Sequence, residues 1–466
     1  MRVTSSSLLE YYAECSRNSL NFRVKIKKNS TTMNNKILIT VKNFGPIEGP
    51  ITLNLNRFII FSGDSGLGKS YLAMLIHFVY RIVAGDDLLQ FLTESKYDYD
   101  TLKEGLCDDE SIICRIPTSD MLRWINSRAL SFMRDMLGNQ NFNGDINIEL
   151  AELPESFTFL YSRKAVIGKN TEEMTYVESL KLSELGHAIQ LPQAGGWGAF
   201  PFMAMISDYL RHLYEIHQTR TFLMPPSRGS LIAVPDNLLY SQRDTMGMYI
   251  EFLNNLSTLK NSRPFEFDDD IVVNAARMLH NEVLHGDIEL SDKDILYKVD
   301  DSVVLPITAA ASSVKELVPF ALIIQKKLMG SYSILFEEPE SHLHPDMQIK
   351  IADLVGYALA DGASFQITTH SDYFLRHIND LIRLFILKNK WNDDDKFNAF
   401  CVKNHYNSGI VIDPELVSAF FLHKDENGRV VVEMQDVAQG IPFDTFKGVT
   451  DSQLASSAEL YDLVDY

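Results

Sequence analysis

The sequence predicts an α/β fold in which a mixed sheet with flanking helices carries a mostly helical insertion. Two segments support this prediction. The apolar run 58–61 leads into the glycine-rich loop 63–70, and apolar residues then recur at helical spacing over 70–83. A second apolar run, 333–336, ends at two adjacent glutamates. Apolar runs without alternation are typical of strands that are buried on both faces of a sheet, so both strands belong in its centre.

The other elements follow from periodicity and turn residues. Alternating residues on both sides of a Gly/Pro turn predict a β-hairpin over 37–44 and 51–56. Between 84 and 219 the sequence becomes mixed and acidic, which indicates an insertion into the core. This insertion has helical stretches at 120–136 and 203–217 and short strand candidates near 146–150 and 157–161. Beyond it we expect strands at 221–224 and 364–368, hairpin-like segments at 295–297 and 303–305, and helices at 271–284, 312–329 and 347–360.

Composition narrows the class of protein. The chain has 466 residues, with 43 basic against 62 acidic residues and a formal charge of −19. This charge repels phosphate backbones and argues against non-specific coating of nucleic acid. No window approaches the roughly 20 apolar residues of a membrane helix, and the first residues have no signal-peptide core. The four cysteines are scattered without metal-ligand spacing, which favours reduced thiols. We therefore expect a cytoplasmic protein with no membrane partner.

The loop between the first buried strand and its helix has the spacing Gly-x4-Gly-Lys-Ser. In such a loop, consecutive backbone N–H groups wrap a triphosphate at a helix N-terminus. Lys69 then reaches the β- and γ-phosphates, and the Ser70 hydroxyl binds Mg²⁺. The sequence therefore predicts a nucleoside triphosphate site with Mg²⁺, built from Gly63, Asp64, Ser65, Gly66, Leu67, Gly68, Lys69 and Ser70.

Besides Lys69, three residues outside this loop are candidates for metal binding and ATP hydrolysis. Glu337 is placed to hold Mg²⁺ and its water shell, and Glu338 is placed to polarise the attacking water. An alternative, acidic residues that match the dipole of a following helix, explains Glu340 better than this pair. His370 ends the last predicted core strand and is placed to contact the γ-phosphate, although a histidine at a strand end is often structural.

The segment Ser312-Ser313-Val314-Lys315-Glu316 has two compatible interpretations. Ser313 and Glu316 have the spacing of a helix capping box. The same helix start, with Ser312, Ser313 and Lys315, presents an anion site to a nucleotide bound on another subunit.

Two polar motifs stay open at this point. Arg228 follows Pro225-Pro226-Ser227, and we expect it either to reach a phosphate or to brace a loop. The pair His342-x-His344 has no cysteine nearby, so a structural or subunit-contact role is favoured over a metal site.

These motifs resemble the ABC-class ATPases related to SMC proteins. The similar branch contains the OLD-type proteins and the ATPase subunits of bacterial anti-phage systems such as PARIS (AriA) and Septu (PtuA). The resemblance covers about 33–84 and 221–400. Its segments, in the order of that branch, are Asn43-Phe44-Gly45-Pro46-Ile47, the phosphate loop, 312–316, 337–345 and 369–372.

The resemblance implies an ABC-type P-loop ATPase head that binds ATP and Mg²⁺ between two subunits. Ser312 and Ser313 of one subunit then face the phosphate loop of the other, so the protein is expected to be a homo-oligomer of dimeric ATPase units. Two features depart from the family pattern. Val314 stands where many ABC proteins carry glycine, and the glutamine that senses Mg²⁺ has only Gln190 and Gln193 as candidates.

With this resemblance the chain divides into four expected segments. They are a flexible N-terminal extension at 1–32, a first part of the ATPase head at 33–84, an inserted lobe at 85–220, and a second part of the head with a C-terminal segment at 221–466.

OLD-type proteins carry a C-terminal TOPRIM nuclease, but only 466 − 370 = 96 residues follow His370 here. The acidic run Asp393-Asp394-Asp395 lies in a polar turn rather than at the end of a buried strand. A nuclease, TOPRIM type favoured, is therefore expected to be a separate effector protein encoded nearby.

The favoured hypothesis is an ATPase that acts as scaffold and sensor of a bacterial anti-phage system. It would sequester the effector and release or activate it when a phage-derived trigger protein is detected. The alternative is a RecF-like repair or recombination ATPase that clamps duplex DNA when ATP is bound, which predicts salt-sensitive DNA binding. A third hypothesis is an ATP-gated assembly protein with negligible turnover.

Overall fold

The structure, a computed structural model, describes two compact units. Unit 1 takes Met1–Leu38, Val79–Ser127 and Ile148–Ile216, and unit 2 takes Ile39–Phe78, Arg128–Asn147 and His217–Tyr466. Within the described ranges, no helix combines the length and apolar character that a membrane span requires. The predicted extension at 1–32 lies outside the described residues. Those residues are 36–102, 104, 110–167, 174–191, 196–233, 247–265, 269–291, 294–441 and 444–464.

A six-stranded sheet forms the centre of unit 2, in the order β16-β15-β3-β14-β13-β9. In this order, the five strands from β15 to β9 run parallel to one another, whereas β16 pairs antiparallel with β15 at the edge. The sheet is therefore mixed, as predicted. Every residue of β3, β13 and β14 is buried, as expected for strands covered on both faces. The strands are β3 (Phe58–Gly63), β9 (Arg220–Met224), β13 (Tyr332–Glu337), β14 (Ser364–Thr368), β15 (Val417–Lys424) and β16 (Val430–Gln435).

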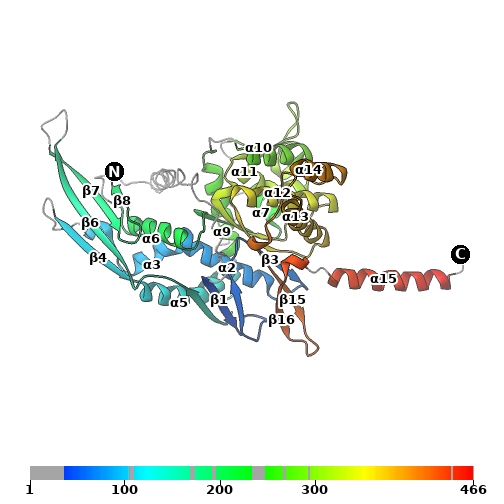
Figure 1. Cartoon of the computed structure of the whole chain (residues 1–466), viewed down its shortest axis with the longest axis horizontal. Helices are drawn as coiled ribbons and strands as arrows, with labels where there is room; N and C mark the ends of the chain where they lie inside the picture. Colours follow the sequence, from blue (N-terminus) through cyan, green and yellow to red (C-terminus); the bar gives the residue numbers. More distant parts are fainter. Residues whose placement is uncertain are drawn as a thin grey trace. The chain divides into compact units, whose positions relative to one another are not determined.

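Helices flank this sheet, and α10, α11, α12 and α13 gather in one part of unit 2 (Figure 1). The expected helices at 271–284, 312–329 and 347–360 are confirmed with shifted boundaries. The first of them ends as a π-helix over Leu279–Leu284. The helices are α2 (Lys69–Ala84), α7 (Arg228–Ile232), α9 (Gly247–Asn261), α10 (Asp270–Met278), α11 (Ser312–Gln325), α12 (Pro345–Asp361), α13 (Asp372–Trp391), α14 (Asp394–Lys403) and α15 (Asp444–Leu463).

Two small sheets confirm the predicted hairpins. The first has the order β2-β1-β5 and the second the order β10-β11-β12. In the first, left-handed backbone at Asn43 and Gly45 closes the turn after β1. The strands are β1 (Ile37–Lys42), β2 (Ile51–Asn54), β5 (Asp145–Leu150), β10 (Asp287–Leu290), β11 (Ile295–Lys298) and β12 (Val304–Pro306).

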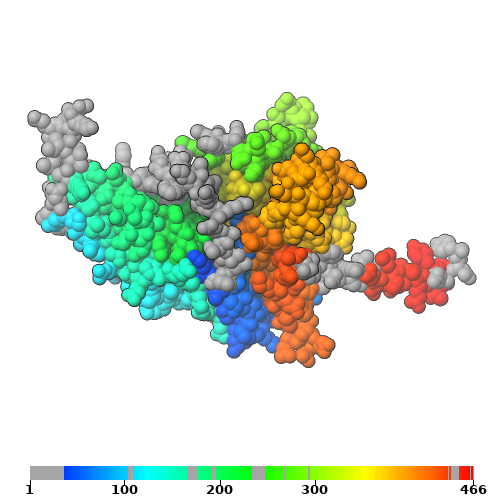
Figure 2. Space-filling view, viewed as in Figure 1, coloured from blue at the N-terminus to red at the C-terminus, as the bar shows by residue number. Residues whose placement is uncertain are grey.

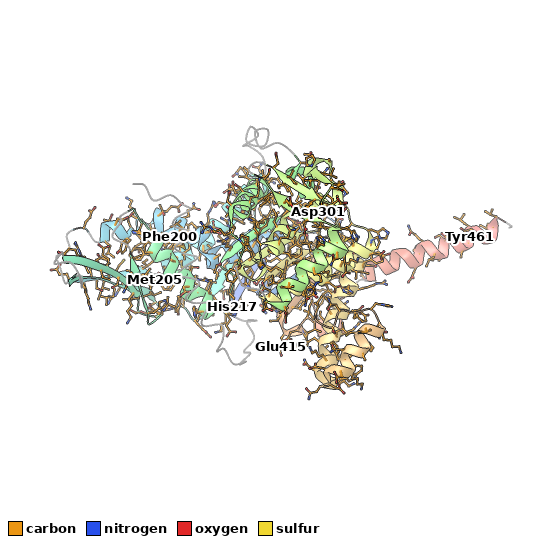
Figure 3. The ribbon with its side chains drawn as sticks, turned by 90° about the horizontal axis from the view of Figure 1, so that it is seen from above. Phe200, Met205, His217, Asp301, Glu415 and Tyr461 are labelled. Carbon is orange, nitrogen blue, oxygen red and sulfur yellow. The ribbon has the colours of Figure 1, made fainter. Side chains whose placement is uncertain are left out.

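Unit 1 contains the predicted helix near 203–217, the first part of the predicted helix at 120–136, and also a four-stranded antiparallel sheet, β4-β6-β7-β8. The insertion is therefore α/β rather than mostly helical. Its long strands interleave apolar and polar residues, so only short fragments of them stand out in the sequence. Phe200 and Met205, labelled in Figure 3, belong to α6. The elements are α3 (Asp86–Glu94), α4 (Tyr99–Leu102), β4 (Ser111–Pro117), α5 (Thr118–Leu137), β6 (Ser156–Ile167), β7 (Met174–Leu182), β8 (Ala188–Leu191) and α6 (Phe200–Leu213).

The last part of the chain completes the central sheet of unit 2. Strand β15 pairs in parallel with β3, the strand that leads into the phosphate loop. Figure 2 shows this orange C-terminal hairpin beside the blue N-terminal segments of the unit. Glu415, labelled in Figure 3, belongs to the 3-10 turn Pro414–Leu416 that leads into β15, while Tyr461 is an exposed residue of α15.

Candidate active site

The phosphate loop lies between β3 and α2, as the sequence predicts. Its backbone has positive φ at Gly63, Gly66 and Gly68, conformations that glycine adopts without strain. The Lys69 Nζ donates hydrogen bonds to the carbonyl oxygens of Gly63 at 3.0 Å and Asp64 at 2.7 Å. The amine of the loop is therefore held across the concave backbone where phosphates bind in this motif.

Gly63 has a second reason to be glycine. A Cβ at this position would lie 1.9 Å from the carbonyl oxygen of Leu422 on β15. No side chain fits at that distance, so any substitution at Gly63 would push the phosphate loop away from the sheet.

Ser70 and Glu337 meet although they are 267 residues apart in the chain. The Ser70 Oγ donates a hydrogen bond to Glu337 Oε2. The other oxygen, Glu337 Oε1, is buried without a hydrogen-bond partner within the described part of the chain. A hydroxyl beside a buried carboxylate with a spare oxygen fits Mg²⁺, which prefers oxygen ligands. Ser70 and Glu337 are thus the residues that would hold the ion, and the ion would neutralise phosphate charge.

Charge at this site is buried at a cost. Burial, with a smaller contribution from the neighbouring Glu338, raises the pKa of Glu337 to about 7, although the hydrogen bond from Ser70 opposes this shift. Burial also lowers the pKa of Lys69 to about 8, which the charges of Glu338 and Asp64 partly oppose. A bound cation would favour the charged form of Glu337, and bound phosphates would favour the charged form of Lys69. Both residues are therefore suited to a magnesium–triphosphate ligand.

Glu338 follows β13 in a strained conformation, with φ of 43°. Its backbone N–H donates to the carbonyl of Thr368 at 2.9 Å, which fixes the turn. Its carboxylate accepts a hydrogen bond from the Ser341 hydroxyl at 3.0 Å. A strained residue that its surroundings hold in place is common at catalytic sites.

His370 lies at the end of β14 and is half-buried. Burial lowers its pKa, and the charge of Lys69 lowers it further, so the imidazole is neutral at pH 7. Its backbone N–H donates to Glu340 Oε1 at 2.6 Å, and the Thr369 hydroxyl donates to the same oxygen at 2.9 Å. The assignment of Glu340 to a helix entrance is therefore wrong, because this carboxylate holds the His370 loop and α12 begins only at Pro345.

Ser312 and Ser313 open α11, but the predicted capping box is wrong. The N-cap residue is Ala311, no side chain caps the helix, and Glu316 is buried instead of reaching back. Ser312 is exposed, and Ser313 and Lys315 are half-buried. Within the described residues, no hydrogen bond or ion pair joins these three to the phosphate loop, so the structure brings together the loop, Glu337, Glu338 and His370 but not the segment from Ser312 to Lys315.

Arg228 braces a loop, which decides between the two roles left open for it. Its side chain is fully buried, and its guanidinium donates to backbone carbonyls of Pro225, Glu316 and Glu337. Sequence reasoning singled out Arg228 for its place after two prolines, but no sequence signal indicates these partners.

The remaining candidates lie elsewhere. Gln190 belongs to β8 in unit 1, where it pairs with Ser179, and Gln193 lies outside the described residues. His342 lies 4.0 Å from a carboxylate oxygen of Glu316, and His344 is the N-cap residue of α12. Among the residues that the structure describes, no cluster of three or more His, Cys, Asp or Glu could hold a metal ion.

Comparison with known proteins adds to this description. Residues 243–375 match the family model of an AAA ATPase domain, a range that includes Glu337, Glu338 and His370 but not the phosphate loop. The chain matches no curated protein.

Several solved structures are similar over most of the chain. An SMC head bound to the C-winged helix domain of ScpA is 12% identical with a TM-score of 0.34, covering 86% of this chain and 98% of that chain. A Pyrococcus furiosus SMC head domain with an extended coiled coil, bound to the C-terminal domain of ScpA, is 12% identical with a TM-score of 0.36, covering 89% and 98%. The SMC head domain from Thermotoga maritima is 11% identical with a TM-score of 0.33, covering 86% and 98%.

The strand order, the phosphate loop and the paired glutamates define a P-loop ATPase head of the ABC-like class. The predicted fold class of the head is thereby confirmed, and the ATPase family model that matches residues 243–375 agrees with it.

Proposed function

We propose that this chain binds and hydrolyses ATP between two of its own copies. We further propose that it belongs to the OLD-like branch and acts as scaffold and sensor of a bacterial anti-phage system. In this role it holds a separate effector, a nuclease with TOPRIM type favoured, until a phage-derived trigger protein is detected.

One observation carries the proposal of assembly through ATP. The phosphate loop meets Glu337, Glu338 and His370 in one copy, whereas the start of α11 contributes nothing to that cluster within the described residues. Ser312 is exposed there, and no side chain caps the helix. Uncapped N–H groups at a helix start attract an anion. A nucleotide held by the phosphate loop of a second copy would satisfy them.

The residues around the phosphate loop suit hydrolysis. Lys69 places positive charge against the β- and γ-phosphates, where negative charge develops during phosphoryl transfer. Glu338 orients the attacking water and accepts its proton as general base. His370 donates a hydrogen bond to a γ-phosphate oxygen and thereby reports its presence to the Glu340 turn, to which its backbone N–H is bonded.

The C-terminal segment supports a separate effector. Strand β15 completes the central sheet, and Asp393 accepts a hydrogen bond from the Lys396 N–H as the N-cap residue of α14. The acidic run 393–395 is therefore used in capping a helix and lies away from the end of any core strand. The proposal therefore assigns no nuclease role to this acidic run and gives the nuclease chemistry to a separate partner encoded nearby.

The test is the mass in solution of the wild type, Lys69→Ala and Glu338→Gln, with and without Mg-ATP. Each protein is expressed alone and together with its genomic neighbour. We expect Glu338→Gln to assemble with ATP and to capture the neighbour, while Lys69→Ala stays unassembled. A mass that is the same with and without Mg-ATP would overturn the proposal.

A second arm tests the RecF-like alternative. Binding of a fluorescent duplex is measured over a salt series with each protein. Tight ATP-dependent binding that weakens steeply with salt, without capture of the neighbour, would favour a DNA clamp over a scaffold.

A further inference from the structure

Arg228 lies between the start of α11 and the end of β13, two parts of the head whose coupling the proposed function requires. Its side chain is 0% exposed, which is rare for an arginine. It follows Ser227, a residue in left-handed backbone, and begins the short helix α7. The turn therefore directs the side chain inward, toward α11 and β13.

The guanidinium joins those two elements through separate nitrogen atoms. Nε donates to the backbone carbonyl of Glu316 on α11 at 2.9 Å, and it lies 3.5 Å from the Oε2 of the same residue. Nη1 donates to the backbone carbonyl of Glu337 at 2.9 Å. The group also lies over the Phe336 ring, 4.7 Å from its centroid. Because a guanidinium is planar and rigid, a shift of α11 moves the donor that holds Glu337.

Simple stabilisation does not account for this pair of charges. Arg228 Nη2 and Glu316 Oε2 are both buried without a hydrogen-bond partner in the described part of the chain. Burial also lowers the pKa of Arg228 to about 10. A buried ion pair is often no more stabilising than apolar residues of the same volume. What the pair adds is a fixed geometry between α11 and the end of β13.

Two further contacts tighten the connection. A Cβ on Gly229 would lie 2.9 Å from Glu316 Oε1 and 3.0 Å from Lys315 Cβ, so α7 packs directly on the start of α11. Glu316 Oε1 also lies 4.0 Å from His342 Nε2, in the turn that follows Glu338. The start of α11 is thus linked to the end of β13 through Arg228 and to the turn after Glu338 through His342.

We propose that Arg228 is a positioning residue that couples the start of α11 to the Mg²⁺-holding end of β13. This inference rests on the proposed function, in which the second copy's nucleotide docks on Ser312 and Ser313. Docking shifts or rigidifies α11, and the guanidinium passes that change to the Glu337 carbonyl. Metal affinity in one site then depends on occupation of the other.

The experiment measures metal affinity with and without assembly. All proteins carry Glu338→Gln to slow hydrolysis, and Mn²⁺ replaces Mg²⁺ so that electron paramagnetic resonance reports the free ion. Half-saturation of the ATP-bound protein by Mn²⁺ is compared between chains with Ser313 intact and chains with Ser313→Arg, which blocks docking. We expect assembly to lower the Mn²⁺ concentration at half-saturation about tenfold, a common size for coupling between sites.

Arg228→Lys keeps the charge but loses the planar fork. With this substitution the assembled and blocked forms should differ by less than about twofold, although both still bind ATP. Gly229→Ala is the second variant, because it keeps every charge and only presses α7 away from α11. It should reduce the ratio to an intermediate value even if Arg228→Lys does not fold.

The outcomes separate the two proposals. If the parent protein does not assemble with ATP by mass, the proposed function fails and the coupling fails with it. If the parent assembles but the tenfold ratio persists in Arg228→Lys, or in Gly229→Ala where Arg228→Lys is unfolded, only the coupling is overturned. A variant that loses unfolding temperature without changing the ratio shows that Arg228 is merely structural.

Discussion

Glu337 in the head and Glu178 in the lobe are both buried carboxylates on strands, but their surroundings differ. Glu178 on β7 is 7% exposed and accepts a hydrogen bond from the Tyr99 hydroxyl at 3.0 Å. Glu337 on β13 is 2% exposed, and one of its oxygens has no partner among the described residues. A satisfied buried acid stabilises its surroundings, whereas an incompletely satisfied one destabilises them until a ligand binds. The lobe acid is therefore part of the architecture, and the head acid is part of the chemistry.

The largest expected effect comes from Glu338→Gln. Loss of the general base should lower the rate of ATP hydrolysis about 10²- to 10⁴-fold. The unfolding temperature should stay within a few degrees, since the amide keeps the shape of the side chain. Phosphate release and thermal unfolding measure the two quantities. If the unfolding temperature also falls well below that of the wild type, Glu338 stabilises the fold as Glu178 does, and the distinction between the head acids and the lobe acid is lost.

Lys69→Met should separate binding from stability in a second way. Removing the ammonium should weaken ATP binding about 100-fold, because its hydrogen bonds to phosphate are charge-assisted. The nucleotide-free protein should unfold at a higher temperature than the wild type, because the desolvation that lowers the pKa of Lys69 is removed. Calorimetric titration and thermal unfolding provide the readouts, and an unfolding temperature below that of the wild type contradicts this account.

In the lobe, Tyr99→Phe should have the opposite signature. It removes the hydroxyl that donates to Glu178, and the free energy of unfolding should fall by about 1–3 kcal/mol. ATP affinity should not change. Tyr97→Phe, on a half-buried tyrosine two residues earlier, is the matched control and should change stability by no more than about 0.5 kcal/mol. Urea unfolding measures the free energy of unfolding of both variants. Equal decreases in the two would show that the hydrogen bond from Tyr99 to Glu178 has no special role in stability.

The smallest expected effect is on the pH dependence of ATP binding. Burial lowers the pKa of Lys69 to about 8 in the nucleotide-free protein, so Lys69 loses its charge as the pH rises through 8. Between pH 8 and pH 9 the ATP affinity should fall about fivefold, the decline in the charged fraction for that pKa. The same shift destabilises the folded, nucleotide-free state below pH 8, and this cost diminishes as the pH rises toward the unfolded value of 10.5. An affinity that is constant over this interval, measured by titration, contradicts the assignment.

The sequence predicted the core of the head because its signals are local. A glycine loop between an apolar strand and an amphipathic helix is visible in consecutive residues, and so is the pair Glu337–Glu338 after a second apolar strand. These motifs also located the meeting of Ser70 with Glu337, because the carboxyl ends of parallel strands share one edge of a sheet.

What the sequence did not reveal depends on contacts between distant segments. Glu340 resembles an acid before a helix, yet it holds the His370 loop, because the turn after β13 and the end of β14 adjoin. Glu316 resembles a capping residue, yet the buried charge of Arg228 draws it inward. Most of the lobe sheet was not predicted, apart from the strand candidate at 157–161 within β6, because its strands interleave polar and apolar residues, which weakens the apolar pattern.

The close approach of Gly63 to Leu422 has a consequence for synthesis of the protein. The strand before the phosphate loop lies between β14 and β15, whose residues leave the ribosome more than 300 positions after it. The nascent chain therefore holds its nucleotide loop without either neighbouring strand for most of translation. Since long-range pairing of this kind is slow to form, we expect the nucleotide loop to bind ATP only after β15 has been synthesised and has paired with β3. Assembly through ATP then cannot precede the synthesis of β15.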